Sequence, residues 1–213
     1  FEEDLGGIID TTTLITGFTI QNGYAQEASG WPNNTGGGIF CGVNTSPSIS
    51  NLIISGNTSS RGGGIYCGGN TNVKNVTISG NTSPNGGGIY SYGGIFTNLI
   101  ISGNSSGFGG GINILGDNED IMTDPVFRNV LVYNNTAVYG GGFAIEHSDP
   151  MLINVTIYGN SVGGQSSVDG GGIYNGNTNP NTILKNSIVW NNSPNEMYAP
   201  GDIVVSYSDI QGG

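Results

Sequence analysis

Two short signatures alternate along the chain and constrain its fold more than any other feature. Six copies of Gly-Gly-Gly followed by an apolar residue have triplets ending at Gly38, Gly64, Gly88, Gly111, Gly142 and Gly172. The second signature, apolar-x-Gly/Asn-Asn, ends at Asn57, Asn81, Asn104, Asn135, Asn160 and Asn192. In the shortest copies the second signature recurs after 24 residues, from Asn57 to Asn81, and then after 23, to Asn104. A repeat of this length, lengthened elsewhere by insertions, indicates a solenoid with one turn per repeat.

The composition indicates strands and turns within each repeat. The chain has 40 glycines in 213 residues but no strict three-residue period, which excludes collagen. Charged residues make up only 9%, too few for a disordered polyelectrolyte, and helix-forming residues are scarce. Residues 73–78, Val-Lys-Asn-Val-Thr-Ile, have the period of two that is typical of a strand. We therefore predict short parallel strands.

In-register stacking would turn equivalent positions of successive repeats into columns, with neighbours about 4.8 Å apart. One column is Asn51, Asn75, Asn98, Asn129, Asn154 and Asn186. Asparagine tolerates a left-handed backbone and its amide can donate to the next amide, so we expect a buried asparagine ladder at one corner. Two apolar columns are predicted to form the core: Ile49, Val73, Phe96, Phe127, Leu152 and Leu184, and Ile54, Ile78, Ile101, Val132, Ile157 and Val189. The fold class we predict is all-β, a single right-handed parallel β-helix of about seven coils over residues 1–213.

The repeats also resemble a known family. Gly-Gly-Gly-Ile-Tyr-Cys at 62–67 and Ile-Ser-Gly-Asn at 78–81 are similar to right-handed β-helices of the pectate-lyase-like superfamily. More narrowly, they resemble chlamydial polymorphic outer membrane protein repeats and similar repeats of secreted bacterial surface proteins. The resemblance extends from about Leu14 to Gly213 and implies a secreted or cell-surface protein. It does not specify an activity, because the fold carries lyases, hydrolases, adhesins and structural spikes alike.

Six carboxylates gather in one long insertion and on the corresponding turn of the next coil: Asp117, Glu119, Asp120, Asp124, Glu146 and Asp149. Oxygen ligands concentrated in this way could hold Ca²⁺, although their spacing matches no EF-hand and the alternative is a solvated acidic loop.

The single histidine, His147, is expected to be an exposed turn residue. Adjacent Ser148 and Asp149 cannot converge with it as a catalytic triad.

Two aromatic columns are predicted to face outward and to be exposed. The first follows the glycine triplets and the second lies near the C-terminal end; together they supply the candidate ligand-binding residues Tyr66, Tyr90, Tyr174, Tyr133, Tyr158 and Trp190. Rows of aromatic rings suit stacking on sugars or contact with proteins. The alternative is that the rings only stack on one another and stabilise the strands.

Cys41 and Cys67 share an inward column, where buried thiols are favoured over a disulfide because stacked parallel neighbours orient their Cβ atoms badly for bridging.

Charge and hydropathy narrow the partners. A formal net charge of −11 opposes binding to nucleic acid. The sequence contains no run of 18 apolar residues, so no transmembrane segment is predicted. Three of the four basic residues, Lys74, Arg128 and Lys185, immediately precede an asparagine of the predicted ladder and are expected to be solvated. The chain opens on Phe1 and acidic residues without the parts of a signal peptide, and neither end shows an evident cap. We expect a segment of a larger extracellular protein, or one that associates end to end.

The sequence favours a non-catalytic extracellular or cell-surface scaffold, structural or adhesive, with a polysaccharide or another surface protein as partner. A filament built by end-to-end contacts is a further possibility that the uncapped ends suggest. The alternative is a polysaccharide lyase or glycoside hydrolase of the pectate-lyase-like class, in which Arg128 would be the best candidate base. No complete set of catalytic residues is predicted.

Overall fold

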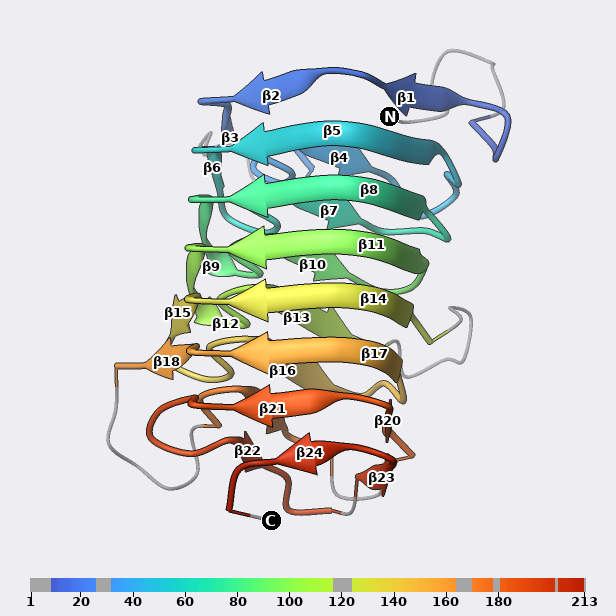
Figure 1. The fold of residues 1–213 in the computed structure, drawn as a ribbon. Coiled ribbons are helices and arrows are strands. Elements are labelled where there is room, and N and C mark those ends of the chain that lie inside the picture. Colours follow the sequence, from blue (N-terminus) through green and yellow to red (C-terminus); the bar gives the residue numbers. More distant parts are fainter. Residues whose placement is uncertain are drawn as a thin grey trace.

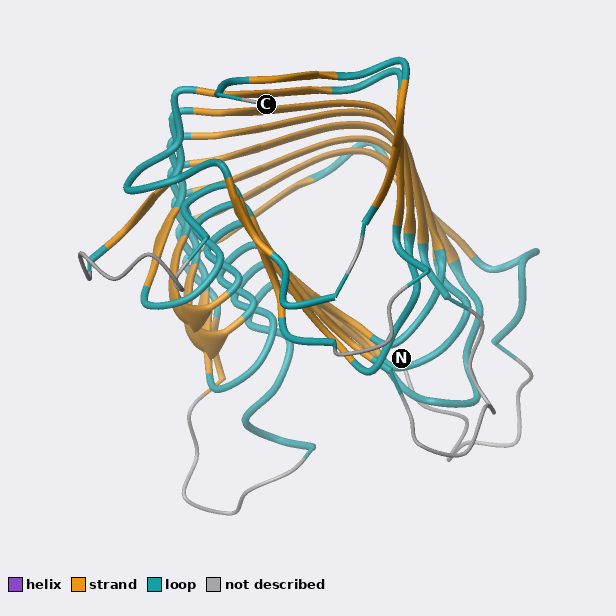
Figure 2. Cartoon of the chain, turned by 90° about the horizontal axis from the view of Figure 1, so that it is seen from below, coloured by secondary structure: helices purple, strands orange, loops and turns teal. Residues whose placement is uncertain are grey.

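The described strands form three parallel sheets that wind around a common core, as Figure 1 shows. The computed structural model describes residues 9–25, 32–116, 124–163, 170–177, 181–201 and 203–212, and these residues contain no helix. Seen from below in Figure 2, the coils lie over one another around the core. The chain is thus a right-handed parallel β-helix, as the alternating signatures predict.

The large sheet runs in the order β1-β5-β8-β11-β14-β17-β20-β23, with β2, β21 and β24 continuing its outermost coils. Its strands are β1 (Leu14–Thr16), β2 (Thr19–Gln21), β5 (Ser48–Ser55), β8 (Asn72–Ser79), β11 (Ile95–Ser102), β14 (Val126–Tyr133), β17 (Met151–Tyr158), β20 (Ile183–Lys185), β21 (Ile188–Trp190), β23 (Val204–Ser206) and β24 (Asp209–Ile210). Each of the five longest strands bends at its ladder asparagine, so the large sheet continues around a corner of the coil (Figure 2).

Two smaller sheets close each coil. The second sheet contains β4 (Ile39–Cys41), β7 (Ile65–Cys67), β10 (Ile89–Ser91), β13 (Ile112–Leu115), β16 (Phe143–Glu146), β19 (Ile173–Asn175) and β22 (Met197–Tyr198). The third contains β3 (Tyr24–Ala25), β6 (Thr58–Ser59), β9 (Thr82–Asn85), β12 (Ser105–Phe108), β15 (Thr136–Ala137) and β18 (Ser161–Val162). The glycine triplets connect the third sheet to the second.

The strand register agrees with the columns predicted from the sequence. Ile101 of β11 pairs with Ile78 of β8 and with Val132 of β14, and the same correspondence holds along the large sheet. Both predicted apolar columns are buried, and Ile210 of the last coil packs against the core. Burial of these aliphatic and aromatic side chains is the main stabilising contribution, because each stacked residue removes apolar surface from water.

The glycine triplets are required because successive coils approach closely there. In the triplet 86–88, Gly86 has a φ of +65°, a left-handed conformation that costs other residues energy. A Cβ atom on Gly87 or Gly88 would lie 2.5 Å from a carbonyl oxygen of the next coil. The backbone instead hydrogen-bonds directly between coils, for example from the Gly87 N–H to the Gly109 carbonyl at 3.1 Å.

The predicted asparagine ladder exists, but it is exposed rather than buried. Its residues have φ between 49° and 55°, and the Asn98 amide donates to Asn75 Oδ1 at 3.0 Å. The expectation of burial was wrong because the strand turns at this left-handed residue, so that the following residue, Leu99, points inward instead. We call the stacked set Asn51, Asn75, Asn98, Asn129 and Asn154 the outer ladder.

A second asparagine ladder, formed by the repeat signature itself, is the buried one. We call Asn57, Asn81, Asn104, Asn135, Asn160 and Asn192 the inner ladder. Asn104 Oδ1 accepts from both the backbone N–H and the side-chain amide of Asn81, at 2.9 and 3.0 Å. The Asn104 amide in turn donates to the Ile78 carbonyl at 3.1 Å and to Asn135 Oδ1 at 2.9 Å. Every polar atom of such a side chain is therefore satisfied inside the protein.

The two cysteines lie opposite each other in adjacent coils as buried free thiols, as the sequence favoured. Cys41 of β4 pairs in register with Cys67 of β7. Burial raises the pKa of the Cys41 thiol to about 11, and burial together with the neighbouring Cys41 raises the pKa of Cys67 well above its ordinary value. Both side chains therefore behave as small protonated hydrophobes at neutral pH.

Candidate functional site

Two of the three candidate residues of the first aromatic column are covered, which corrects the prediction that they are exposed. Tyr66 and Tyr90 are only 2% and 3% exposed, and the ring of Tyr92 packs edge-on against both. The guanidinium carbon of Arg61, which lies on the segment returning from the third sheet to the second, is 5.9 Å from the centre of the Tyr90 ring. The rings of Tyr66 and Tyr90 stack on each other at 5.4 Å, so they stabilise the coils and offer no face to a ligand.

Farther along the stack, the large aromatic side chains lie on the returning segments instead of on the second sheet. Where the second sheet has Asn113 and Ala144, the returning segments carry the large side chains Phe108 and Tyr139, which stack at 4.9 Å. Tyr139 then contacts Tyr174, and Tyr174 is half-buried against Tyr198 at 5.6 Å. These contacts agree with the alternative interpretation, in which the aromatic residues stack on one another and stabilise the coils.

The outer face of the large sheet is different, because it is open and apolar. Its central column points outward and contains Thr19, Ile53, Thr77, Ile100, Leu131, Thr156 and Ile188. The four large aliphatic members are between 37% and 49% exposed. We call this column the apolar stripe. Threonines separate most of these aliphatic side chains, and only Ile100 and Leu131 are direct neighbours in the column. Exposed apolar side chains grouped on one face indicate a contact surface.

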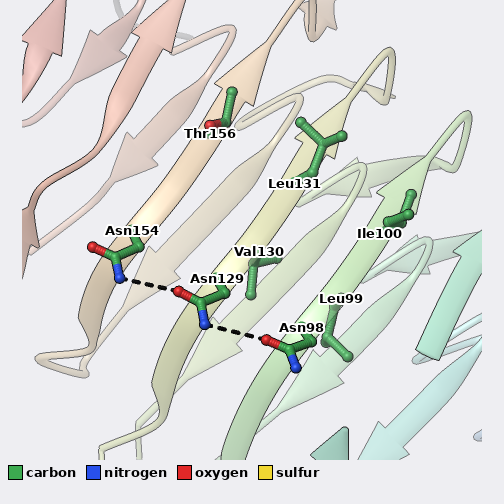
Figure 3. A pocket seen from close by; sticks show the side chains of 8 residues that line it. All are labelled: Asn98, Leu99, Ile100, Asn129, Val130, Leu131, Asn154 and Thr156. Atoms are coloured by element: carbon green, nitrogen blue, oxygen red, sulfur yellow. Dashed lines mark hydrogen bonds between the residues drawn. The ribbon is translucent and has the colours of Figure 1, made fainter. Parts of the chain in front are cut away.

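A shallow groove lies between the apolar stripe and the outer ladder. It has a volume of about 390 Å³ and is lined by Asn98, Leu99, Ile100, Asn129, Val130, Leu131, Asn154 and Thr156. Figure 3 shows the three asparagine amides in a row, with Ile100, Leu131 and Thr156 farther along the same strands. Asn129 donates to Asn98 at 3.2 Å and Asn154 donates to Asn129 at 3.0 Å. Each amide has two hydrogens, and the ladder uses one of them.

The second predicted aromatic column borders this face. Tyr133, Tyr158 and Trp190 are in register on β14, β17 and β21. Tyr133 is half-buried, whereas Tyr158 and Trp190 are 46% and 42% exposed. These two rings, unlike Tyr66 and Tyr90, are accessible for stacking on a ligand. Their role in binding stays a prediction.

Three basic side chains lie on the other side of the outer ladder. Lys74, Arg128 and Lys185 are exposed on β8, β14 and β20, as expected from the sequence. Among the described residues, no hydrogen bond or ion pair holds their charged groups. The described strands of the large sheet contain a single acidic residue, Asp209 of β24. The three basic side chains and Asp209 are thus the charged residues of these strands, and Asp124 and Asp149 lie in the turns just before β14 and β17.

Only part of the predicted acidic cluster lies within the described residues. Asp117, Glu119 and Asp120 lie outside the described residues, and the described acidic, cysteine and histidine side chains form no group of three suited to a metal. Asp124 Oδ1 accepts from the Ser148 hydroxyl and the Asp149 N–H, at 2.8 and 2.7 Å. Asp149 likewise accepts from the backbone of Asn181 at 2.8 Å. These carboxylates join turns of neighbouring coils, and the calcium prediction stays a prediction.

His147 is an exposed turn residue, as expected. Its φ is +54°, and its backbone N–H donates to Asn177 Oδ1 at 2.5 Å. The Ser148 hydroxyl is used by Asp124, so the sequence Glu-His-Ser-Asp at 146–149 builds a turn between coils.

The groove residues of the outer ladder are the functional candidates that the sequence interpretation missed. A signal was present, because five of the six predicted ladder asparagines are followed directly by an apolar residue: Leu52, Val76, Leu99, Val130 and Val155. All five are buried. If three apolar columns face inward, the asparagine and the residue before it must both face outward, and the ladder must lie on the surface.

Comparison with known proteins finds a similarity in two of the repeats. Residues 51–68 and 75–92 each match the Chlamydia polymorphic membrane protein repeat. The matched segments include the outer-ladder asparagines Asn51 and Asn75 and the glycine triplets that end at Gly64 and Gly88. No curated protein and no solved structure shows significant similarity to the chain. Within the described ranges, no helix has the length and hydropathy needed to cross a membrane.

Proposed function

We propose that this chain is a non-catalytic scaffold of a cell-surface or secreted protein, and that it adheres to its partner through the outer face of the large sheet. The match to the Chlamydia polymorphic membrane protein repeat supports a surface location. The continuous hydrogen bonding between coils supports a rigid framework, because each coil is fixed to its neighbours through three sheets and two ladders.

The observation that carries the proposal is the contrast between the two aromatic columns. Tyr66 and Tyr90 are covered by the protein's own chain, whereas Tyr158 and Trp190 remain exposed beside the apolar stripe and the groove. A face that combines aromatic rings, aliphatic side chains and amides in register can contact a sugar or a protein surface over several coils. Rigid strands hold these groups without the entropic cost of ordering a loop.

A glycan array, run with and without Ca²⁺ and paired with a screen of surface proteins, tests the proposal. We expect binding that is reduced at least about tenfold by the double variant Tyr158→Ser/Trp190→Ser. The matched control is Val138→Ser, which removes a 51% exposed apolar side chain from the third-sheet side of the molecule. An equal loss of binding with the double variant and with Val138→Ser would contradict the assignment of this face. Ligand binding that neither variant changes would contradict it as well.

The two arms with and without Ca²⁺ also address the acidic cluster. If the carboxylates around Asp124 and Asp149 hold calcium, removal of the ion lowers the thermal stability of the chain. Binding by the large sheet is expected to persist in either arm, because its groove and its aromatic residues contain no carboxylate.

A further inference from the structure

The basic residues beside the outer ladder recur with a regular spacing. Lys74 pairs in register with Thr97, and Thr97 pairs with Arg128. Arg128 pairs with Ile153, and Ile153 pairs with Lys185. A positive charge therefore occurs on every second coil, and successive charges are about 9.6 Å apart along the stack.

The groups between these charges are uncharged and also regular. Each coil adds one outer-ladder amide and one residue of the apolar stripe. Amide hydrogens and oxygens suit sugar hydroxyls, whereas the C–H faces of sugar rings suit the exposed aromatic rings of Tyr158 and Trp190 beside the stripe. A pyranose in an extended polysaccharide advances by roughly the height of one coil.

From this pattern we propose that the face binds an acidic polysaccharide with one charged group on every second sugar ring. The polysaccharide lies along the stack, with its charges beside Lys74, Arg128 and Lys185 and its uncharged rings over the amide groove. The inference rests on the proposed function, because it names the partner of the same face. It goes beyond that function in assigning the charge pattern of the ligand.

The overall charge of the protein selects against other polyanions. A net charge of −11 repels a nucleic acid strongly, because a nucleic acid carries a phosphate on every nucleotide. A polysaccharide with fewer charges is repelled less and can place them beside the three basic side chains. An added peptide strand is also disfavoured, since strand addition requires a sheet edge and this surface is a sheet face. Surface charges of this kind act through attraction that salt weakens.

Binding is best measured by calorimetry with four probes of similar length. Hyaluronan oligosaccharides carry a carboxylate on every second ring, oligogalacturonates carry one on every ring, chitin oligosaccharides are neutral, and a short DNA duplex is the nucleic-acid probe. We expect hyaluronan to bind most tightly and to lose affinity as salt is raised. DNA that binds as tightly as hyaluronan, or preference for the neutral oligomer, overturns the inference.

Two variants separate charge from spacing. Lys74→Gln/Arg128→Gln/Lys185→Gln should weaken hyaluronan binding about tenfold or more, whereas Arg61→Gln, a basic residue outside this face, should leave it unchanged. Thr97→Lys/Arg128→Thr keeps the same number of charges but removes the alternation, and should weaken hyaluronan binding severalfold relative to oligogalacturonate. Equal binding by the wild type and the respaced variant overturns the spacing argument.

The outcomes also distinguish this inference from the proposed function. If Tyr158→Ser/Trp190→Ser abolishes adhesion to a neutral glycan or a protein while the charge variants have no effect, the scaffold proposal stands and the acidic polysaccharide is excluded. All substituted positions are at the surface, so thermal unfolding curves identify any variant that has lost its fold.

Discussion

The two asparagine ladders have the same residue type and the same coil-to-coil spacing, yet they differ in environment and direction. In the inner ladder each amide donates toward the following coil, as from Asn81 to Asn104. In the outer ladder each amide donates toward the preceding coil, as from Asn98 to Asn75. The inner amides are also bonded to backbone groups, whereas the outer amides keep hydrogen-bonding capacity facing solvent.

This difference shows that burial, rather than residue type, determines what a stacked asparagine does. A buried amide must be fully paired because an unpaired one costs about 1 to 3 kcal/mol. An exposed amide can exchange its partner for water or a ligand at little cost. The inner ladder therefore contributes to stability and the outer ladder contributes a surface for recognition.

The largest expected effect follows from breaking the inner ladder at its centre. Asn104→Leu leaves the Asn81 backbone N–H, the Asn81 amide and the Ile78 carbonyl without their partners. We expect the free energy of unfolding to fall by about 3 kcal/mol or more, since several buried groups become unpaired together. Urea denaturation measures the change, and a loss below that of an outer-ladder variant would invalidate the distinction between the ladders.

The end of the inner ladder is expected to show a smaller effect. Glu196 occupies the place of the next asparagine, because its carboxylate accepts from the Asn192 amide at 2.5 Å and from the Asn192 N–H at 3.2 Å. Glu196→Ala should reduce stability by about 1 to 2 kcal/mol, as one charge-assisted acceptor is lost. Glu196→Gln is the matched variant, and partial recovery in thermal unfolding would support the capping role.

For the outer ladder, the backbone rather than the amide is expected to limit substitution. Asn98 has a φ of +55°, so Asn98→Ala should cost about 1 kcal/mol through the left-handed conformation. Asn98→Gly should recover most of that loss, because glycine adopts this conformation freely. Chemical denaturation of both variants tests this, and an equal loss in both would mean that the exposed amide itself is the stabilising group.

The smallest effect is expected at the N-terminal end of the outer ladder. The Asn51 amide donates there to the Thr16 hydroxyl at 3.2 Å, in a partly exposed position. Thr16→Ala should lower stability by about 0.5 kcal/mol, because water replaces the hydroxyl. Thr16→Ser keeps the hydroxyl and serves as the control; a loss as large as that of Glu196→Ala would show that the two ladder ends are equivalent.

The fold and its register could be predicted from the sequence because the columns repeat. Ile54, Ile78 and Ile101 recur with the signature asparagines, and only in-register stacking places them together. The exposure of the outer ladder could also have been inferred, from the third apolar column containing Leu52, Val76 and Leu99. That column breaks the simple period of two at the left-handed residue, where the strand turns.

The covering of Tyr66 and Tyr90 could not be predicted in the same way. The third sheet consists of strands only two to four residues long, such as β6 and β9, with little pattern in their sequence. Whether the returning segment lies over the second sheet depends on packing partners such as Arg61, which pair across coils. The accessible groove likewise depends on the three-dimensional bend at Asn98 and Asn129 rather than on a motif.

The stacking of coils has a mechanical consequence. Successive inner-ladder asparagines are 23 to 32 residues apart, and each such segment contributes only about 4.8 Å to the length of the stack. A pulling force applied at the two ends would detach coils from the ends inward, because each coil is held only by its neighbours. Each detached coil would release roughly 75 to 115 Å of extended chain. The molecule would thus resist small loads as a stiff rod and lengthen in discrete steps under large ones.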